Sequence, residues 1–208
     1  KFTGLRVSNQ APFNDATPPQ INVSYTGMDR SALVQLFEDL PYNVGYEKVG
    51  NPTINNGIMT NTTYEDYAKA SSSLDLTSNS KLEFNIRFKT PETLEGGFRT
   101  LLSPDVWDSP IIMVTSSINN YYLAGYAGDL YQVELDVDTY YRAKMIKSAN
   151  SNIWTIYCYD DNLQLLGSTS GETVATQNKP ILIGASYGSA SPAIQAIDLN
   201  NTSIKVND

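Results

Sequence analysis

The chain has 208 residues, with 14 lysines and arginines against 22 aspartates and glutamates, so its formal net charge is −8. It contains no histidine and one cysteine. These counts exclude a Ser-His-Asp triad, a Cys-His pair, a histidine metal site and an internal disulfide. The acidic balance argues against a nucleic-acid partner, because neutralising phosphates requires clustered lysines and arginines.

The first 44 residues read as an extension that precedes the main domain. Weak alternation predicts strands over 2–7 and 21–25, separated by a proline-rich loop. Asp29 is a candidate N-cap for a short helix that Pro41 ends. We expect residues 1–44 to pack on the domain that follows.

Targeting signals are not visible in this sequence. No basic segment followed by an apolar one begins the chain, and the first residue is not methionine, so we expect an excised part of a longer protein. The longest apolar run, 111–114, is far shorter than the ~18–20 residues that span a bilayer, and we expect no membrane insertion.

From residue 45 onward the sequence has the signals of β-structure. Alternating apolar and polar residues over 82–88 predict a strand with one buried face. Short strands separated by turn residues predict an antiparallel β-sandwich over 45–208, and no 20–50-residue repeat is present. The further predicted strands are 100–103, 111–114, 121–126, 130–137, 141–146, 153–159, 181–185, 193–198 and 202–206.

Several segments resemble known sandwich families. Four are similar to core strands of concanavalin A-like and laminin-G-like domains: 82–91, 140–146, 154–161 and 181–184. The segments 53–58 and 196–207 resemble parts of tail and baseplate proteins of phages that infect Gram-positive bacteria. The resemblance covers 45–207 and implies an all-β jelly roll of the lectin type.

The resemblance also implies a role. Such domains are non-catalytic carbohydrate-binding modules of phage baseplate or distal-tail proteins, which act outside the host cell as part of the virion. The implied partners are a host cell-wall or cell-surface polysaccharide and neighbouring tail or baseplate proteins. A structural module that only holds virion proteins together, with a tyrosine-rich protein interface, is the alternative.

Tyrosine is frequent, with 14 tyrosines against 6 phenylalanines and 2 tryptophans. A tyrosine ring packs on a surface while its hydroxyl meets water or a polar ligand. The same residue also suits half-exposed sheet faces through β-propensity alone. Both uses stay open, and we expect sheet packing for Tyr140, Tyr141, Tyr157 and Tyr159.

Loop aromatics beside carboxylates and amides are the candidate sugar-binding groups. Pyranose rings pack their C–H faces on aromatic rings, while Asp and Asn side chains hydrogen-bond the hydroxyls. Trp107 lies in a loop bracketed by prolines, although it could equally fold back onto the core. Strand alternation places Tyr122 and Tyr126 on one face. The predicted site residues are Trp107, Asp105, Asp108, Asn120, Tyr122, Tyr126 and Tyr187.

A cluster of carboxylates offers an enzymatic alternative. If 130–137 is a strand, Glu134, Asp136 and Asp138 share one face at steps of about 6.6–7 Å. This pattern resembles the E-x-D-x-E signature of retaining glucanases, but the last residue is one methylene shorter than that signature requires. The other interpretation is a solvated strand face, with the core taking Val133, Leu135 and Val137. We expect no enzyme, and a hydrolase using Glu134 and Asp138 is the alternative.

No cofactor is expected. Calcium is considered for Asp136 with Asp138 and for 160–162, but the EF-hand pattern is absent and turn formation explains 160–162. Cys158 shares a strand face with apolar residues, and we expect it to be a small buried hydrophobe.

Overall fold

Thirteen strands and no helix form the part of the chain that the structure, a computed structural model, describes: residues 46–60, 65–76, 81–94, 97–104, 110–116, 120–174, 178–185 and 196–207. The helix predicted after Asp29 and the strands predicted over 2–7 and 21–25 lie outside these ranges. Within them, no helix is long and apolar enough to cross a membrane. The strands are β1 (Tyr46–Val49), β2 (Thr53–Asn55), β3 (Ile58–Thr60), β4 (Tyr67–Asp75), β5 (Lys81–Lys89), β6 (Phe98–Ser103), β7 (Ile112–Ser116), β8 (Tyr121–Gly125), β9 (Tyr140–Lys147), β10 (Ile153–Asp160), β11 (Leu165–Glu172), β12 (Asn178–Ile183) and β13 (Ala196–Asn207).

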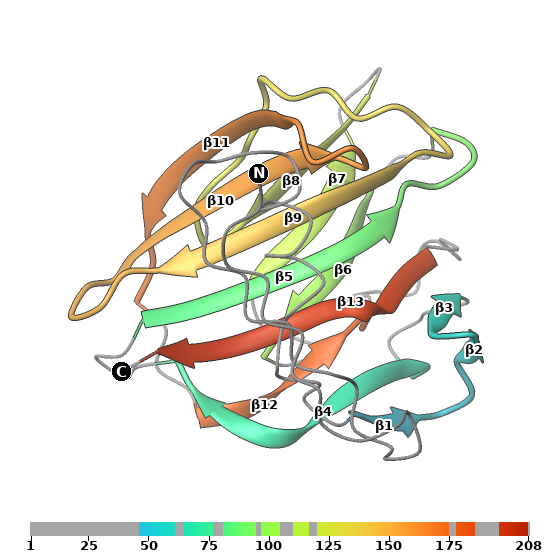
Figure 1. The fold of residues 1–208 in the computed structure, drawn as a ribbon, viewed down its shortest axis with the longest axis horizontal. Helices are drawn as coiled ribbons and strands as arrows, with labels where there is room; N and C mark the ends of the chain where they lie inside the picture. Colours follow the sequence, from blue (N-terminus) through green and yellow to red (C-terminus); the bar gives the residue numbers. More distant parts are fainter. Residues whose placement is uncertain are drawn as a thin grey trace, which may run out of the picture.

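The strands form two antiparallel sheets. The six-stranded sheet has the order β1-β4-β12-β6-β7-β8, and the seven-stranded sheet has the order β11-β10-β9-β5-β13-β3-β2. Figure 1 shows β5, β9 and β10 of the seven-stranded sheet lying across β6, β7 and β8 of the other sheet. The predicted antiparallel sandwich is confirmed.

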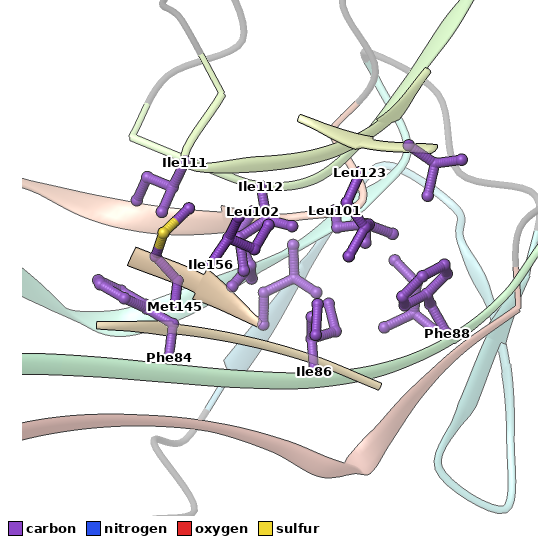
Figure 2. Close-up of a cluster of buried hydrophobic side chains, with 14 of the residues drawn as sticks. Phe84, Ile86, Phe88, Leu101, Leu102, Ile111, Ile112, Leu123, Met145 and Ile156 are labelled. Carbon is purple, nitrogen blue, oxygen red and sulfur yellow. The ribbon is translucent and has the colours of Figure 1, made fainter. Parts of the chain in front are cut away.

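The core lies between the sheets, where the alternation of β5 places its apolar residues. Leu82, Phe84, Ile86 and Phe88 are all within 1% of complete burial. Figure 2 shows Phe84, Ile86 and Phe88 facing apolar residues of the opposite sheet, including Leu101, Leu102, Ile112 and Leu123. Burying one such side chain stabilises the fold by about 1.5–3 kcal/mol, so this strand alone anchors one sheet on the other.

The segment after β8 differs from its prediction. The strand ends at Gly125, whose φ is 151° and where a Cβ atom would lie 2.1 Å from the Ile111 carbonyl oxygen. Residues 130–137 form turns rather than the predicted strand, with one isolated bridge between Tyr121 and Leu135. Val133 and Leu135 are buried as expected, but Val137 is 41% exposed, because turns do not preserve alternation.

This segment, 126–139, closes one side of the sandwich. Its backbone donates to β8, from Leu130 N to Leu123 O and from Leu135 N to Tyr121 O, each at 2.8 Å. It also packs against β11, where Cβ atoms added at Gly167 and Gly171 would meet Val133 and Ala127. The segment thus replaces a further strand at the edge of the six-stranded sheet.

Other features of the strands were not predicted. None of the predicted strands corresponds to β1, β2, β3, β4 or β11. β11 consists largely of Gly, Ser and Thr, which give no hydrophobic period. The sequence predicted two separate strands over 193–198 and 202–206. In the structure a single strand, β13, covers the second segment and the described part of the first. Its register against β5 shifts between Asp198 and Ser203.

Candidate functional site

The outer face of the seven-stranded sheet carries polar and aromatic side chains in rows. The register sets Asp198, Arg87, Arg142 and Tyr159 side by side across four strands. The next row runs Ser203, Asn85, Lys144 and Tyr157. We call the following set the polar sheet face: Glu83, Asn85, Arg87, Tyr140, Arg142, Lys144, Tyr157, Tyr159, Asp161, Asp198 and Ser203.

Arg87 lies at the centre of this face. Its Nε and Nη2 each donate at 2.8 Å to the two carboxylate oxygens of Asp161, and its Nη1 donates at 2.9 Å to Asp198 Oδ2. The guanidinium carbon stands 3.9 Å from the ring centroid of Tyr140. Hydrogen bonds from Arg87 lower the pKa of Asp161, and the same bonds raise the pKa of Arg87. Arg142 Nε lies 3.8 Å from Asp161 Oδ1. The guanidinium of Arg87 is therefore held by Asp161, Asp198 and the ring of Tyr140.

Asp198 holds its place because it closes the irregular part of β13. Its Oδ1 accepts from the backbone N–H groups of Asn200 and Asn201, at 3.1 and 3.2 Å. Its Oδ2 accepts from Asn201 Nδ2 at 2.9 Å, and its backbone oxygen accepts from the Thr202 hydroxyl at 2.8 Å. The Asp198 side chain is only 7% exposed, so the partner of Arg87 is part of the fold itself.

The second row is held by Glu83. Lys144 Nζ lies 3.0 Å from Glu83 Oε1, and Asn85 Nδ2 donates at 3.3 Å to both Glu83 Oε1 and Ser203 Oγ. Burial favours the neutral acid, but hydrogen bonds from Lys144 and Asn85 outweigh it and hold the pKa of Glu83 below its usual value. Asn85 is 1% exposed. These groups are pre-ordered rather than free to rotate.

The tyrosines give this face its apolar component. Tyr140, Tyr157 and Tyr159 are half-buried on the outer side of β9 and β10. Tyr141 points the other way and packs on Phe88 in the core, with ring centroids 6.2 Å apart. The alternation of β9 and β10 could have identified this face, since Tyr157 and Tyr159 have the opposite parity to the buried Trp154.

The three predicted site residues that the structure describes do not gather at one place. Asn120 and Tyr122 lie where β8 starts, whereas Tyr126 follows its far end. Tyr122 is 9% exposed beneath Tyr131, with ring centroids 4.5 Å apart. Tyr126 packs edge-on against Trp154 at 5.1 Å. The predicted common face of Tyr122 and Tyr126 is wrong, because β8 ends before Tyr126. Four predicted residues lie outside the described ranges: Trp107, Asp105, Asp108 and Tyr187.

Three of the carboxylates considered for catalysis or calcium have other partners: Asp138, Asp160 and Asp161. Glu134, Asp136 and Asp138 are exposed on turns, so the strand that would align them is missing. Asp138 forms an ion pair with Lys89. Asp160 Oδ1 accepts from Gln164 N at 2.8 Å. In the described ranges, no three or more acidic or cysteine side chains gather as metal ligands.

Cys158 is confirmed as a buried small side chain. It is 0% exposed, and burial raises the pKa of its thiol to about 12.

Comparisons with known proteins agree on the fold. No protein-family model and no curated protein sequence matches the chain. Among solved structures, basic winged bean lectin with Tn-antigen aligns at a TM-score of 0.54 and 10% identity, over 77% of this chain and 92% of the lectin. Lectin I-B4 from Griffonia simplicifolia aligns at 0.50 and 12%, over 79% and 95%. The botulinum neurotoxin serotype D binding domain aligns at 0.55 and 12%, over 81% of this chain and 44% of that one. These likenesses establish a lectin-type sandwich.

Proposed function

We propose that this domain is a non-catalytic carbohydrate-binding module and that the accessible residues of the polar sheet face form its binding surface: Arg87, Tyr140, Lys144, Tyr157, Tyr159 and Asp161. The observation that carries the proposal is the cluster of Arg87, Asp161 and Tyr140, in which a bidentate ion pair lies beside an aromatic ring. Neighbouring sugar hydroxyls both donate and accept, and a fixed guanidinium and carboxylate pair meets both needs.

Pre-ordering strengthens this case. Fixing a long charged side chain on binding costs about 0.5–1.5 kcal/mol, and here Arg87 and Lys144 are already held by ion pairs. Asp161 is 41% exposed, so it keeps accepting capacity toward solvent. Tyr157 and Tyr159 add rings on which an apolar pyranose face can pack.

The charge pattern favours a neutral saccharide. Within the polar sheet face, the cations Arg87, Arg142 and Lys144 are matched by the carboxylates of Glu83, Asp161 and Asp198. Lys205, opposite Glu83 in the register, adds one further cation beside them. An excess of one positive charge creates only a weak field for a polyanion, and the chain as a whole carries −8.

The biological setting of the proposal rests on the sequence resemblance. Segments 53–58 and 196–207 resemble phage tail and baseplate proteins, which supports a module on an adhesion device that binds a host cell-wall or cell-surface polysaccharide. Weak single-site affinity would then be multiplied by many copies on one particle. Neighbouring tail or baseplate proteins are the proposed protein partners.

The test is binding of the purified chain to a glycan array and to host cell-wall polysaccharide. We expect Tyr159→Ala and Tyr157→Ala each to weaken binding about tenfold, which corresponds to about 1.4 kcal/mol. Tyr131→Ala is the matched control, because Tyr131 is 62% exposed and lies outside the polar sheet face. Trp107→Ala tests the loop prediction in the same assay.

Two results would contradict the proposal. Binding that survives both sheet-face variants but is lost with Tyr131→Ala or Trp107→Ala would move the site to the loops. Failure of the wild-type chain to bind any saccharide or envelope preparation would favour a structural module.

A further inference from the structure

Among the strands that the structure describes, the two antiparallel sheets have four edge strands, and three of these are protected. β8 is covered by the backbone of 126–139 through Leu130 and Leu135. β1 is four residues long and carries Glu47 and Lys48, and β2 is three residues long. Short or charged edges of this kind resist pairing with another chain.

β11 is the exception. It is eight residues long, and its first charged residue is Glu172 at its end. Within the described ranges it pairs with β10 alone, at the outer edge of the seven-stranded sheet (Figure 1). Such an edge exposes a row of backbone donors and acceptors that can pair with another strand.

The hydrogen bonds show which residues of β11 face outward. Ser168 O accepts from Gln132 Nε2 at 3.3 Å, a partner outside the sheet, whereas Thr173 N donates inward to Asn152 O at 3.0 Å. Antiparallel pairing alternates between the two sides residue by residue. Ser168, Ser170 and Glu172 therefore point their N–H and C=O groups away from β10.

Exposed apolar side chains gather along the same edge. Of the eight large hydrophobic residues that are exposed in the described ranges, Ile153, Leu165, Leu166 and Val174 lie on or next to the β10–β11 hairpin. Val174 is 65% exposed, and Leu166 is 40% exposed. Ile153 and Val174 lie at the Glu172 end of β11, whereas Leu165 and Leu166 lie at its other end. An unprotected ladder with uncovered apolar groups at both of its ends indicates an interface.

We propose that β11 pairs antiparallel with β11 of a second copy of this chain, joining two seven-stranded sheets into one. A two-fold axis must relate outward-facing residues to each other, and we infer a register centred on Ser170 because it also brings the apolar ends of the two strands together. Ser168 then lies opposite Glu172 of the second copy. Leu166, at the register shift of β11, lies near Val174 of the second copy, just beyond the end of its β11. Exposed apolar residues meet each other.

The charge pattern suits this pairing. Glu172 is the charged residue of β11 in each copy, and the register sets it opposite a serine. No like charges are then directly opposed, which would destabilise the pair. Gln132 occupies one lone pair of the Ser168 carbonyl, and a second lone pair remains for the partner strand.

In this register the outer faces of the two seven-stranded sheets lie on the same side of the joined sheet, because directly opposed residues point to the same face. The two polar sheet faces would thus be presented together. The interface is inferred from the edge alone and does not depend on the proposed saccharide function.

The first experiment measures mass in solution. We expect the wild-type chain to sediment at about twice the 22.9 kDa of one chain at micromolar concentration. Ser170→Lys should convert it to a monomer, because two lysines would face each other across the axis. Ser170→Ala is the matched control, since it equally removes the 2.8 Å hydroxyl contact with Thr155 but should stay dimeric. Circular dichroism checks that both variants are folded.

The second experiment tests the register by oxidation. Directly opposed Cα atoms lie about 4.5–5.5 Å apart, within the range of a disulfide, so Ser170→Cys should form a covalent dimer. Ser168→Cys should not form a covalent dimer, because residue 168 lies opposite Glu172 of the second copy, four residues away from the second introduced cysteine. Cys158 is buried and does not compete. A monomeric wild type overturns the interface, and cross-linking of Ser168→Cys instead of Ser170→Cys overturns the register.

Discussion

Gly171 of β11 should be a position where alanine destabilises the protein. An alanine methyl there would lie 2.8 Å from the Ala127 carbonyl oxygen and 2.9 Å from its carbon. In an ordinary strand, replacing glycine by alanine stabilises the fold by about 0.5–1 kcal/mol. Overpacking costs about 1–3 kcal/mol, and backbone atoms cannot rotate away. We expect a net loss of about 1–2 kcal/mol, which lowers Tm by about 2–8 °C.

The assay is thermal unfolding followed by circular dichroism, with two comparison variants. Gly167→Ala should cost less than Gly171→Ala, because its added methyl meets the end of the Val133 side chain, which can shift. Ser170→Ala, on the exposed side of the same strand, should stay within about 0.5 kcal/mol of wild type. If Gly171→Ala matches or exceeds the wild-type Tm, the segment 126–139 does not lie against β11 and the reasoning is wrong.

Three further predictions concern the polar sheet face and the core. Arg87→Gln should lower the free energy of unfolding by about 1–3 kcal/mol in urea titrations, because it leaves the buried Asp198 carboxylate without its cation. A loss below ~0.5 kcal/mol would show that water screens the ion pair of Arg87 and Asp198. Asp161→Asn should cost about 1 kcal/mol or less above pH 5. The pKa of Asp161 is lowered in the folded state, so this difference from wild type should shrink as the pH falls through that pKa. A difference that stays constant from neutral pH down to the acid unfolding of the wild type would contradict the assignment. Cys158 should react with iodoacetamide at pH 8 only after unfolding, since burial raises the pKa of its thiol to about 12. Rapid labelling of the native chain would place the Cys158 thiol at the surface.

The proposed function and the proposed interface would reinforce each other if both hold. Two polar sheet faces on one side of a joined sheet could engage one polysaccharide chain or two neighbouring chains. Linking two weak sites in this way raises the apparent affinity without any new contact to the sugar. Ser170→Lys would then weaken binding to a polysaccharide-coated surface but leave binding to a soluble oligosaccharide unchanged.

The sequence alone determined the architecture wherever the pattern is local. Alternation in β5 predicted a strand with one apolar face, and the spacing of turn residues predicted an antiparallel sandwich. The burial of Cys158 also followed from its position beside Trp154 and Ile156, because neighbours two residues apart in a strand share a face.

Only the tertiary structure decided the rest. The sequence of β11 lacks a hydrophobic period, and its glycines are explained by the approach of Ala127 and Val133 from a segment some 40 residues away. The turns of 130–137 look like a strand in sequence because Val133, Leu135 and Val137 alternate with polar residues, although Val137 is exposed. The polar sheet face depends on register: Arg87 meets Asp161 and Asp198 across 74 and 111 residues of chain. Local pattern fixes which way a side chain points, but pairing between distant strands decides which side chains meet.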